Sequence, residues 1–88
     1  MEKQLVEPKV IDEKSIDEIL KAAPHLTKFP FQRMWIDYDA EADVLYISFE
    51  RPQNATDSEM RDDGVLLRYR DDRLVGLTIF DASQRRSA

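Results

Sequence analysis

The fold is decided by residues 34–49, which read MWIDYDAEADVLYISF. Early in this stretch Ile36 and Tyr38 alternate with Trp35 and Asp37, and later in it large apolar residues again occupy every second position. A period of two in β-branched and aromatic residues is typical of strands that present different side chains to the two faces of a sheet. The stretch therefore predicts two strands.

Further strands are predicted at 65–69 and 74–80, where apolar side chains again alternate. The polar residues 39–43 predict the first hairpin loop. A long polar loop covers 51–63 and leaves room for a short strand near Ser58–Met60. Together these runs predict a four-stranded antiparallel β-meander, or a five-stranded one if the short strand forms.

The loop between the last two strands, at residues 70–73, admits two registers. A two-residue loop places Leu67 opposite Gly76, whereas a three-residue loop over 70–72 aligns the apolar residues of both strands. Because burial sets register, we expect the three-residue loop. Asp72 would then adopt the left-handed conformation that Asp tolerates.

A short helix is predicted before the sheet. Ser15 and Glu18 have the spacing of a capping box, in which two side chains satisfy N–H groups of the first turn. Apolar residues at 16, 19, 20 and 23 then form one stripe, and Pro24, which lacks an N–H, is expected to end the helix. We expect this helix, at 15–23, to pack on one face of the sheet and complete an α+β fold.

The 88 residues predict a single domain with an internal seam. All Lys lie in the first thirty residues and all Arg lie after them, so we place the seam near Pro30. Residues 1–30 are expected to form an N-terminal arm with the short helix, 31–83 a β-sheet module and 84–88 a flexible tail. The net charge of -5 disfavours nucleic acid, whose binding depends on neutralising phosphates.

The composition excludes several kinds of chemistry. Without Cys the chain has no disulfide, thiol nucleophile or Cys-based zinc site, and the single His25 excludes a multi-histidine metal centre. No secretory signal is visible and no run approaches the ~20 apolar residues of a membrane span, so we expect a cytoplasmic protein without a cofactor. Because so small a chain buries only ~60–65% of its unfolded surface, we expect a homo-oligomer, most simply a dimer.

Acidic residues at every second position from 37 to 43 suggest a hard-cation site, because D-x-D-x-[DN] opens an EF-hand loop. The match fails, since Ala42 and Ser48 stand where that loop needs Gly and Glu. We favour a hairpin in which Asp39 and Asp43 cap backbone N–H groups, and we predict no metal site.

Catalytic arrangements are also weak in this sequence. The carboxylate pairs at 62–63 and 71–72 lie in predicted turns, whereas carboxylate catalysis needs two groups at a set separation in a cleft. The candidate nucleophiles Ser48, Ser58 and Ser83 need a nearby base, and His25 is the only imidazole. We therefore predict that the protein is not an enzyme.

One face of the predicted sheet lacks cover. The helix is expected to cover the face that carries Ile36, Leu45, Ile47, Phe49, Val65, Leu67, Leu77 and Ile79. An open apolar patch on the other side is typical of an interface, where aromatic residues and Arg are enriched. We predict that this interface is formed by Trp35, Val44, Tyr46, Leu66, Arg68, Leu74 and Phe80.

Two separated motifs resemble a known family. Residues 37–47 read DYDAEADVLYI, Asp63-Gly64 follows, and residues 75–83 read VGLTIFDAS. The pattern YD-x-x-x-D-x-LYI, DG and VG-[IL]-x-I-[LF]-x-AS is similar to that of the bacterial domain-of-unknown-function family 2283. The resemblance implies a small β-sheet domain without established activity, and an antitoxin role because members are similar to partners found beside small RelE-like toxins.

The chain departs from the family pattern in three places. The first third lies outside the motifs, the last hairpin loop lacks the Gly that such proteins often carry, and the chain ends at Ala88 where many relatives continue into a C-terminal helix. The helix at 15–23 is the expected substitute for that C-terminal helix, unless a face stays open.

These observations predict a small, acidic, non-enzymatic protein-interaction module, antitoxin-like, that pairs with a second copy or with a small basic protein. The alternative is a sheet that binds single-stranded nucleic acid. There, Trp35, Tyr46 and Phe80 with Arg68 would stack on bases. The expected phosphate contacts are Arg51, Arg61, Arg70 and Arg73. Acidic residues beside these arginines argue against this alternative.

Overall fold

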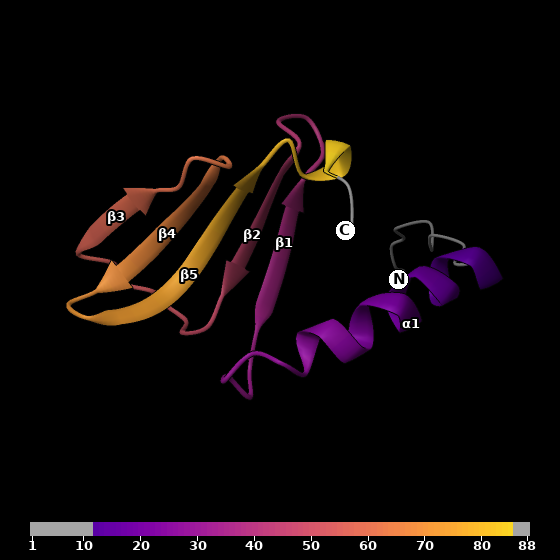
Figure 1. Ribbon diagram of the computed structural model, residues 1–88, viewed down its shortest axis with the longest axis horizontal. Helices are drawn as coiled ribbons and strands as arrows, with labels where there is room; N and C mark the ends of the chain where they lie inside the picture. Colours follow the sequence, from indigo (N-terminus) through magenta and orange to yellow (C-terminus); the bar gives the residue numbers. More distant parts are fainter. Residues whose placement is uncertain (1–11, 86–88) are drawn as a thin grey trace, which may run out of the picture. The chain divides into compact units, whose positions relative to one another are not determined.

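The structure is a computed structural model that describes residues 12–85 (Figure 1). The chain divides after Pro30 into two compact units, Met1–Pro30 and Phe31–Ala88. The division falls at the seam where the Lys-bearing and Arg-bearing parts of the sequence meet. That both units belong to a single domain stays a prediction.

The helix α1 spans Glu13–Leu26 and begins one turn earlier than the capping box suggested. Its N-cap is Asp12, whose carboxylate accepts the backbone N–H of Ser15 at 2.9 Å and the Ser15 hydroxyl at 3.0 Å. These hydrogen bonds lower the pKa of Asp12. The prediction that Ser15 caps the helix was therefore wrong, because Asp12 offers a charged acceptor to the same first turn.

Pro24 does not end the helix, as the sequence had suggested, but lies inside it. It removes only its own N–H from the ladder, and the carbonyls of the last turn find other donors. The Thr27 N–H donates to the Ala23 carbonyl at 3.2 Å and the Thr27 hydroxyl donates to the Pro24 carbonyl at 2.8 Å. The helix therefore continues to Leu26.

The apolar stripe of α1 contains Ile16, Ile19 and Leu20, and these side chains are exposed. No described residue of the helix is buried. The predicted packing of this helix on one face of the sheet stays a prediction.

The second unit contains a five-stranded antiparallel sheet, which confirms the predicted α+β class and includes the short strand. The strands are β1 (Trp35–Asp39), β2 (Val44–Ser48), β3 (Asp57–Met60), β4 (Val65–Arg70) and β5 (Arg73–Phe80). A 3-10 turn, η1 (Ala82–Gln84), follows the last strand.

The strand order is β1-β2-β5-β4-β3, which differs from a simple meander because β5 lies between β2 and β4 (Figure 1). The longest strand, β5, takes the centre, where both of its backbone edges are paired. The polar β3 has four exposed residues and takes an edge. Sequence alternation alone carries no information about this order, because it describes faces and not neighbours.

The β4–β5 hairpin corrects the predicted register. Arg70 pairs with Arg73 across a two-residue turn, and Asp71 rather than Asp72 has the left-handed backbone, with φ of 55°. A register shift then leaves Val75 without a partner on β4, so that Leu67 faces Leu77. This β-bulge achieves the apolar alignment for which the longer loop was predicted.

The core of the described sheet unit is small. Its buried hydrophobic side chains are Val44, Ile47, Phe49 and Val75, and Val75 is 0% exposed. The rings of Phe31 and Phe49 stack with centroids 4.0 Å apart, which adds favourable aromatic contact.

Candidate functional site

Asp43 joins the first hairpin to the segment after β5. It ends the hairpin loop in the left-handed conformation, with φ of 56°. Its carboxylate accepts the Tyr38 hydroxyl at 2.7 Å, the Ser83 N–H at 3.0 Å and the Ser83 hydroxyl at 2.9 Å, while its carbonyl accepts the Ala82 N–H at 3.0 Å. We call Tyr38, Asp43 and Ser83 the latch, which holds η1 beside the β1–β2 turn (Figure 1).

The latch shifts two titrations in opposite directions. Hydrogen bonds from Tyr38 and Ser83 stabilise the carboxylate and lower the pKa of Asp43. The bond to Asp43 raises the pKa of Tyr38, since ionisation would remove the donor and place a second negative charge beside the carboxylate. The Ser83 hydroxyl donates to a carboxylate that also accepts hydrogen bonds from Tyr38 and from the Ser83 N–H. This arrangement is typical of a structural role.

The first hairpin loop is held by Asp39. Its Oδ1 accepts the N–H groups of Glu41 at 3.1 Å and Ala42 at 3.2 Å, as the capped-turn interpretation predicted. Asp43, expected to cap the same turn, instead caps the distant Ser83. Among residues 12–85 there is no group of three or more His, Cys, Asp or Glu side chains placed to hold a metal ion.

Gly64 and Arg85 connect the loop before β4 to the segment that follows η1. The Arg85 guanidinium donates to the Phe80 carbonyl at 2.9 Å and to the Gly64 carbonyl at 3.2 Å. Gly64 has φ of 83°, and a Cβ there would lie 2.8 Å from the Arg85 Nη2. Within the tail predicted at 84–88, Gln84 belongs to η1 and Arg85 donates these hydrogen bonds, while residues 86–88 lie outside the described residues.

Gly76 leaves room for the long loop to return to the sheet. The Gln53 amide lies where a side chain on residue 76 would be, and its Nε2 donates to the Ser48 hydroxyl at 2.8 Å. Gly76 itself is buried. Each Gly of the two motifs therefore has a structural reason. Gly64 adopts a positive φ, and Gly76 leaves the space that a side chain would fill.

Two of the arginines considered for phosphate contacts are paired with carboxylates. Arg61 lies 2.8 Å from Asp63, and Arg73 makes a two-pronged pair with Glu50, in which Nη2 donates to Oε1 at 3.0 Å. The second pair lowers the pKa of Glu50. Such pairing reduces the charge that these arginines offer to an anion.

The register brings most of the predicted interface residues to one side of the sheet, which we call the mixed face. Val44 pairs with Phe80, and Leu66 and Tyr46 both pair with Thr78. In the next row Trp35 pairs with Ser48 and Arg68 with Gly76. Leu74 was predicted for this face, but beyond the bulge it pairs with Tyr69 and so lies on the opposite side of the sheet.

Exposure on the mixed face is uneven. Val44 is buried and Tyr46 is 41% exposed, while the remaining four predicted residues on this face, Trp35, Leu66, Arg68 and Phe80, are half-buried. The Nε of Arg68 is buried without a hydrogen-bond partner. Ser48 and Thr78 interrupt the apolar surface, so the face is chemically mixed.

The opposite side, which we call the apolar face, is more continuous. Its first cross-strand row is Ile36, Ile47, Leu77 and Leu67, and its second is Tyr38, Leu45, Ile79 and Val65. Ile36 is 52% exposed and Tyr38 51%, Ile47 is buried, and the remaining five are half-buried. The sequence prediction assigned this side to the helix and therefore did not consider it as an interface. The signal available in the sequence was the uninterrupted alternation of apolar residues on this side of the strands.

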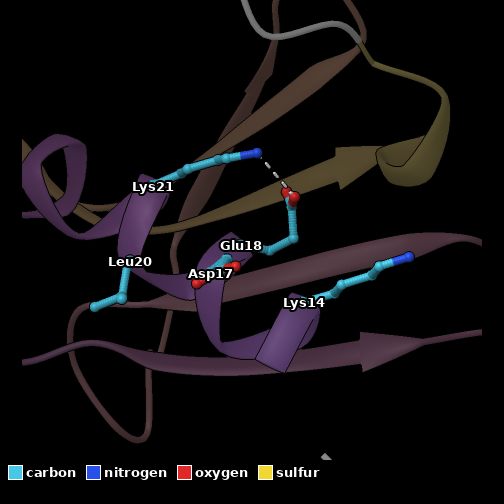
Figure 2. A pocket seen from close by; sticks show the side chains of 5 residues that line it. All are labelled: Lys14, Asp17, Glu18, Leu20 and Lys21. Atoms are coloured by element: carbon cyan, nitrogen blue, oxygen red, sulfur yellow. Dashed lines mark hydrogen bonds and ion pairs between the residues drawn. The ribbon is translucent and has the colours of Figure 1, made fainter. Parts of the chain in front are cut away.

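The hollows in the described surface are shallow and charged. Figure 2 shows one beside α1. Its lining side chains are Lys14, Asp17, Glu18, Leu20 and Lys21. Lys21 and Glu18 form an ion pair of 3.1 Å with both side chains 73% exposed, so the hollow is open to water. Another hollow is lined by residues 59–63. Within residues 12–85 no helix has the length and apolarity that a membrane span requires.

The sheet, the latch and the two glycine contacts define a small α+β protein built on a five-stranded antiparallel sheet. Residues 35–83 match the family model described as "Protein of unknown function (DUF2283)". The match covers more than half of the 88 residues, and the chain belongs to this family, as its motifs predicted. No curated protein and no solved structure matches the chain.

Proposed function

We propose that this chain is a non-enzymatic protein-interaction module that pairs through one side of its sheet. The carrying observation is the contrast between the small core and the rows of apolar side chains that stay half-buried or exposed on the sheet. Apolar surface of this kind lowers its free energy by about 25 cal/mol per Å² when a partner removes it from water. Small domains commonly gain stability through such association.

A structural use of the shifted carboxylates supports a non-enzymatic function. Asp43 and Tyr38 bind each other and Ser83 at an exposed corner, and Glu50 binds Arg73. Catalytic carboxylates work in clefts that push their pKa values apart for proton transfer. Here the shifts arise from bonds that fasten segments together.

The partner classes are a second copy or a small basic protein. The net charge of -5 would steer a basic partner and raise its association rate. In the second case the protein would act as an antitoxin towards a small basic toxin. The cytoplasmic location expected for either pairing belongs to the same proposal.

Sedimentation velocity of the purified chain, alone and with the product of the neighbouring gene, tests the proposal. We expect a homo-oligomer or a hetero-complex, and a change in Trp35 fluorescence would indicate that the contact uses the mixed face. A compact monomer that binds neither copy nor neighbour, with unchanged fluorescence, contradicts the proposed function. Inhibition of the neighbouring protein's activity would support the antitoxin role specifically.

Single-stranded nucleic acid remains the second candidate because of one observation. Arg68 has an unpartnered buried Nε on the face that also carries Trp35, Tyr46 and Phe80. Filter binding with mixed single-stranded RNA at low salt tests it, because electrostatic binding is strongest there. Absence of retention removes this candidate.

A further inference from the structure

The apolar face fits a second copy of this chain, and we propose that two copies pack these faces against each other. This inference rests on the proposed function and names both its partner and its surface. It also moves the contact from the mixed face, where the sequence had placed it, to the opposite side of the sheet, and it takes the place of the predicted packing of the helix on that side.

The first argument is composition. The eight positions of the apolar face carry no formal charge, and seven of them are aliphatic. A two-fold interface must be complementary to itself, because the same patch is contributed by both copies. A continuous neutral surface meets this requirement, since no charge needs an opposite charge across the contact.

The mixed face meets the requirement less well. Burial there would desolvate Arg68, whose Nε already lacks a partner, together with Asp37 on the same side of β1. A buried charge without a bonded partner is costly. Val44 on that face is already buried and offers little further surface.

The sheet edges explain why association would use a face and not an edge. The edge strand β1 carries Asp37 and Asp39, and the edge strand β3 carries Asp57 and Glu59, all exposed. Pairing an edge with its own copy would bring like charges together, a common protection against extended edge-to-edge stacking. Face packing between two copies closes on itself and stops at a dimer.

The acidic β3 also selects one arrangement of the two sheets. Glu59 pairs with Leu67 and therefore projects on the same side as the apolar face, at its border. An arrangement that places β3 over β3 of the second copy would bring the two Glu59 carboxylates together. With the two-fold axis parallel to the strands, β3 instead lies over β1 of the second copy, near Ile36, at the ~10 Å spacing of packed sheets.

The test compares Ile36→Glu on the apolar face with Tyr46→Glu on the mixed face. Both native side chains are substantially exposed, at 52% and 41%, so the sheet should tolerate either glutamate. Circular dichroism verifies the fold, and sedimentation equilibrium measures the dimer dissociation constant. We expect Ile36→Glu to raise that constant by at least about 100-fold, since it places a second carboxylate against Glu59 of the other copy in a contact without water. Tyr46→Glu should change it by less than about threefold.

The outcomes separate this inference from the proposed function. Dissociation by Tyr46→Glu but not by Ile36→Glu overturns the inference and returns the contact to the mixed face. A monomeric wild type that binds the neighbouring gene product overturns the inference alone. A monomer that binds nothing overturns both.

Cysteine cross-linking gives a second readout that needs no charged substitution. Because the natural chain has no Cys, disulfides can form only at introduced positions. A mixture of Ile36→Cys and Glu59→Cys proteins should form the mixed disulfide dimer faster than Glu59→Cys forms its own. Faster self-linking of Glu59→Cys contradicts the parallel axis, and equal linking by a Tyr46→Cys control contradicts the apolar-face contact.

Discussion

The helix α1 and the sheet unit, each taken by itself, are stabilised in different ways. The side-chain bonds of α1 join residues three positions apart, as in Asp12 with Ser15 and Glu18 with Lys21. In the sheet unit Asp43 binds Ser83 across 40 positions. The helix buries none of its described residues, whereas the sheet includes a fully buried side chain. Local hydrogen bonds therefore stabilise the helix, whereas contacts between distant residues bury the side chains of the sheet unit.

The largest expected effect is on the buried core of the sheet unit. Val75→Ala removes two methyl groups at the fully buried bulge and should lower the free energy of unfolding of the sheet by about 2–3 kcal/mol. Chemical denaturation followed by circular dichroism measures it. The control Val65→Ala, at a half-buried position, should cost less than half as much. Equal losses would show that the bulge is not the centre of the core.

A smaller effect is expected at Gly64. Gly64→Ala forces a Cβ into the left-handed region and towards Arg85, and it should destabilise the sheet by about 1–2 kcal/mol. Thermal unfolding measures the loss. In an Arg85→Ala background the same substitution keeps its backbone cost but loses the collision. An unchanged melting temperature for Gly64→Ala would contradict the assigned backbone conformation.

The latch should make stability depend on pH. The pKa of Asp43 lies below its ordinary value of 3.8 in the folded chain, so its stabilisation is complete above pH 3.8 and is lost as pH falls through the lowered value. Asp43→Asn should reduce the melting temperature at neutral pH and flatten its decline in acid. Melting curves from neutral to acidic pH measure both, with Asp62→Asn as an exposed control. Parallel curves for wild type and Asp43→Asn would contradict the latch.

The smallest expected effect concerns the N-cap of α1. Asp12→Ala removes the N-cap acceptor for Ser15 and should reduce the helical circular dichroism signal, with little change in sheet unfolding. Asp12→Asn, which keeps an acceptor, should retain most of the helix. A large loss of sheet stability in Asp12→Ala would contradict a purely local role for this cap.

Errors of prediction follow the same division between local and long-range effects. Asp12 replaced Ser15 as the cap because its carboxylate accepts the N–H of Ser15, so Ser15 itself lies in the first turn of the helix. Pro24 lies inside the helix, and Thr27 satisfies the carbonyls of Ala23 and Pro24 at the helix end. At the β4–β5 turn, the expected alignment of Leu67 with an apolar partner formed through a bulge at Val75 instead of a longer loop.

The sequence by itself determined the class of elements and the two sides of the sheet, because alternation with period two assigns each side chain to a face through backbone geometry alone. It also identified the family through motifs that lie along the strands. Only the tertiary structure decided that β5 is central, that Asp43 binds Ser83, and that Gln53 occupies the space above Gly76. These features join residues far apart in the chain, and no local pattern specifies which distant partner satisfies a hydrogen bond or fills a space.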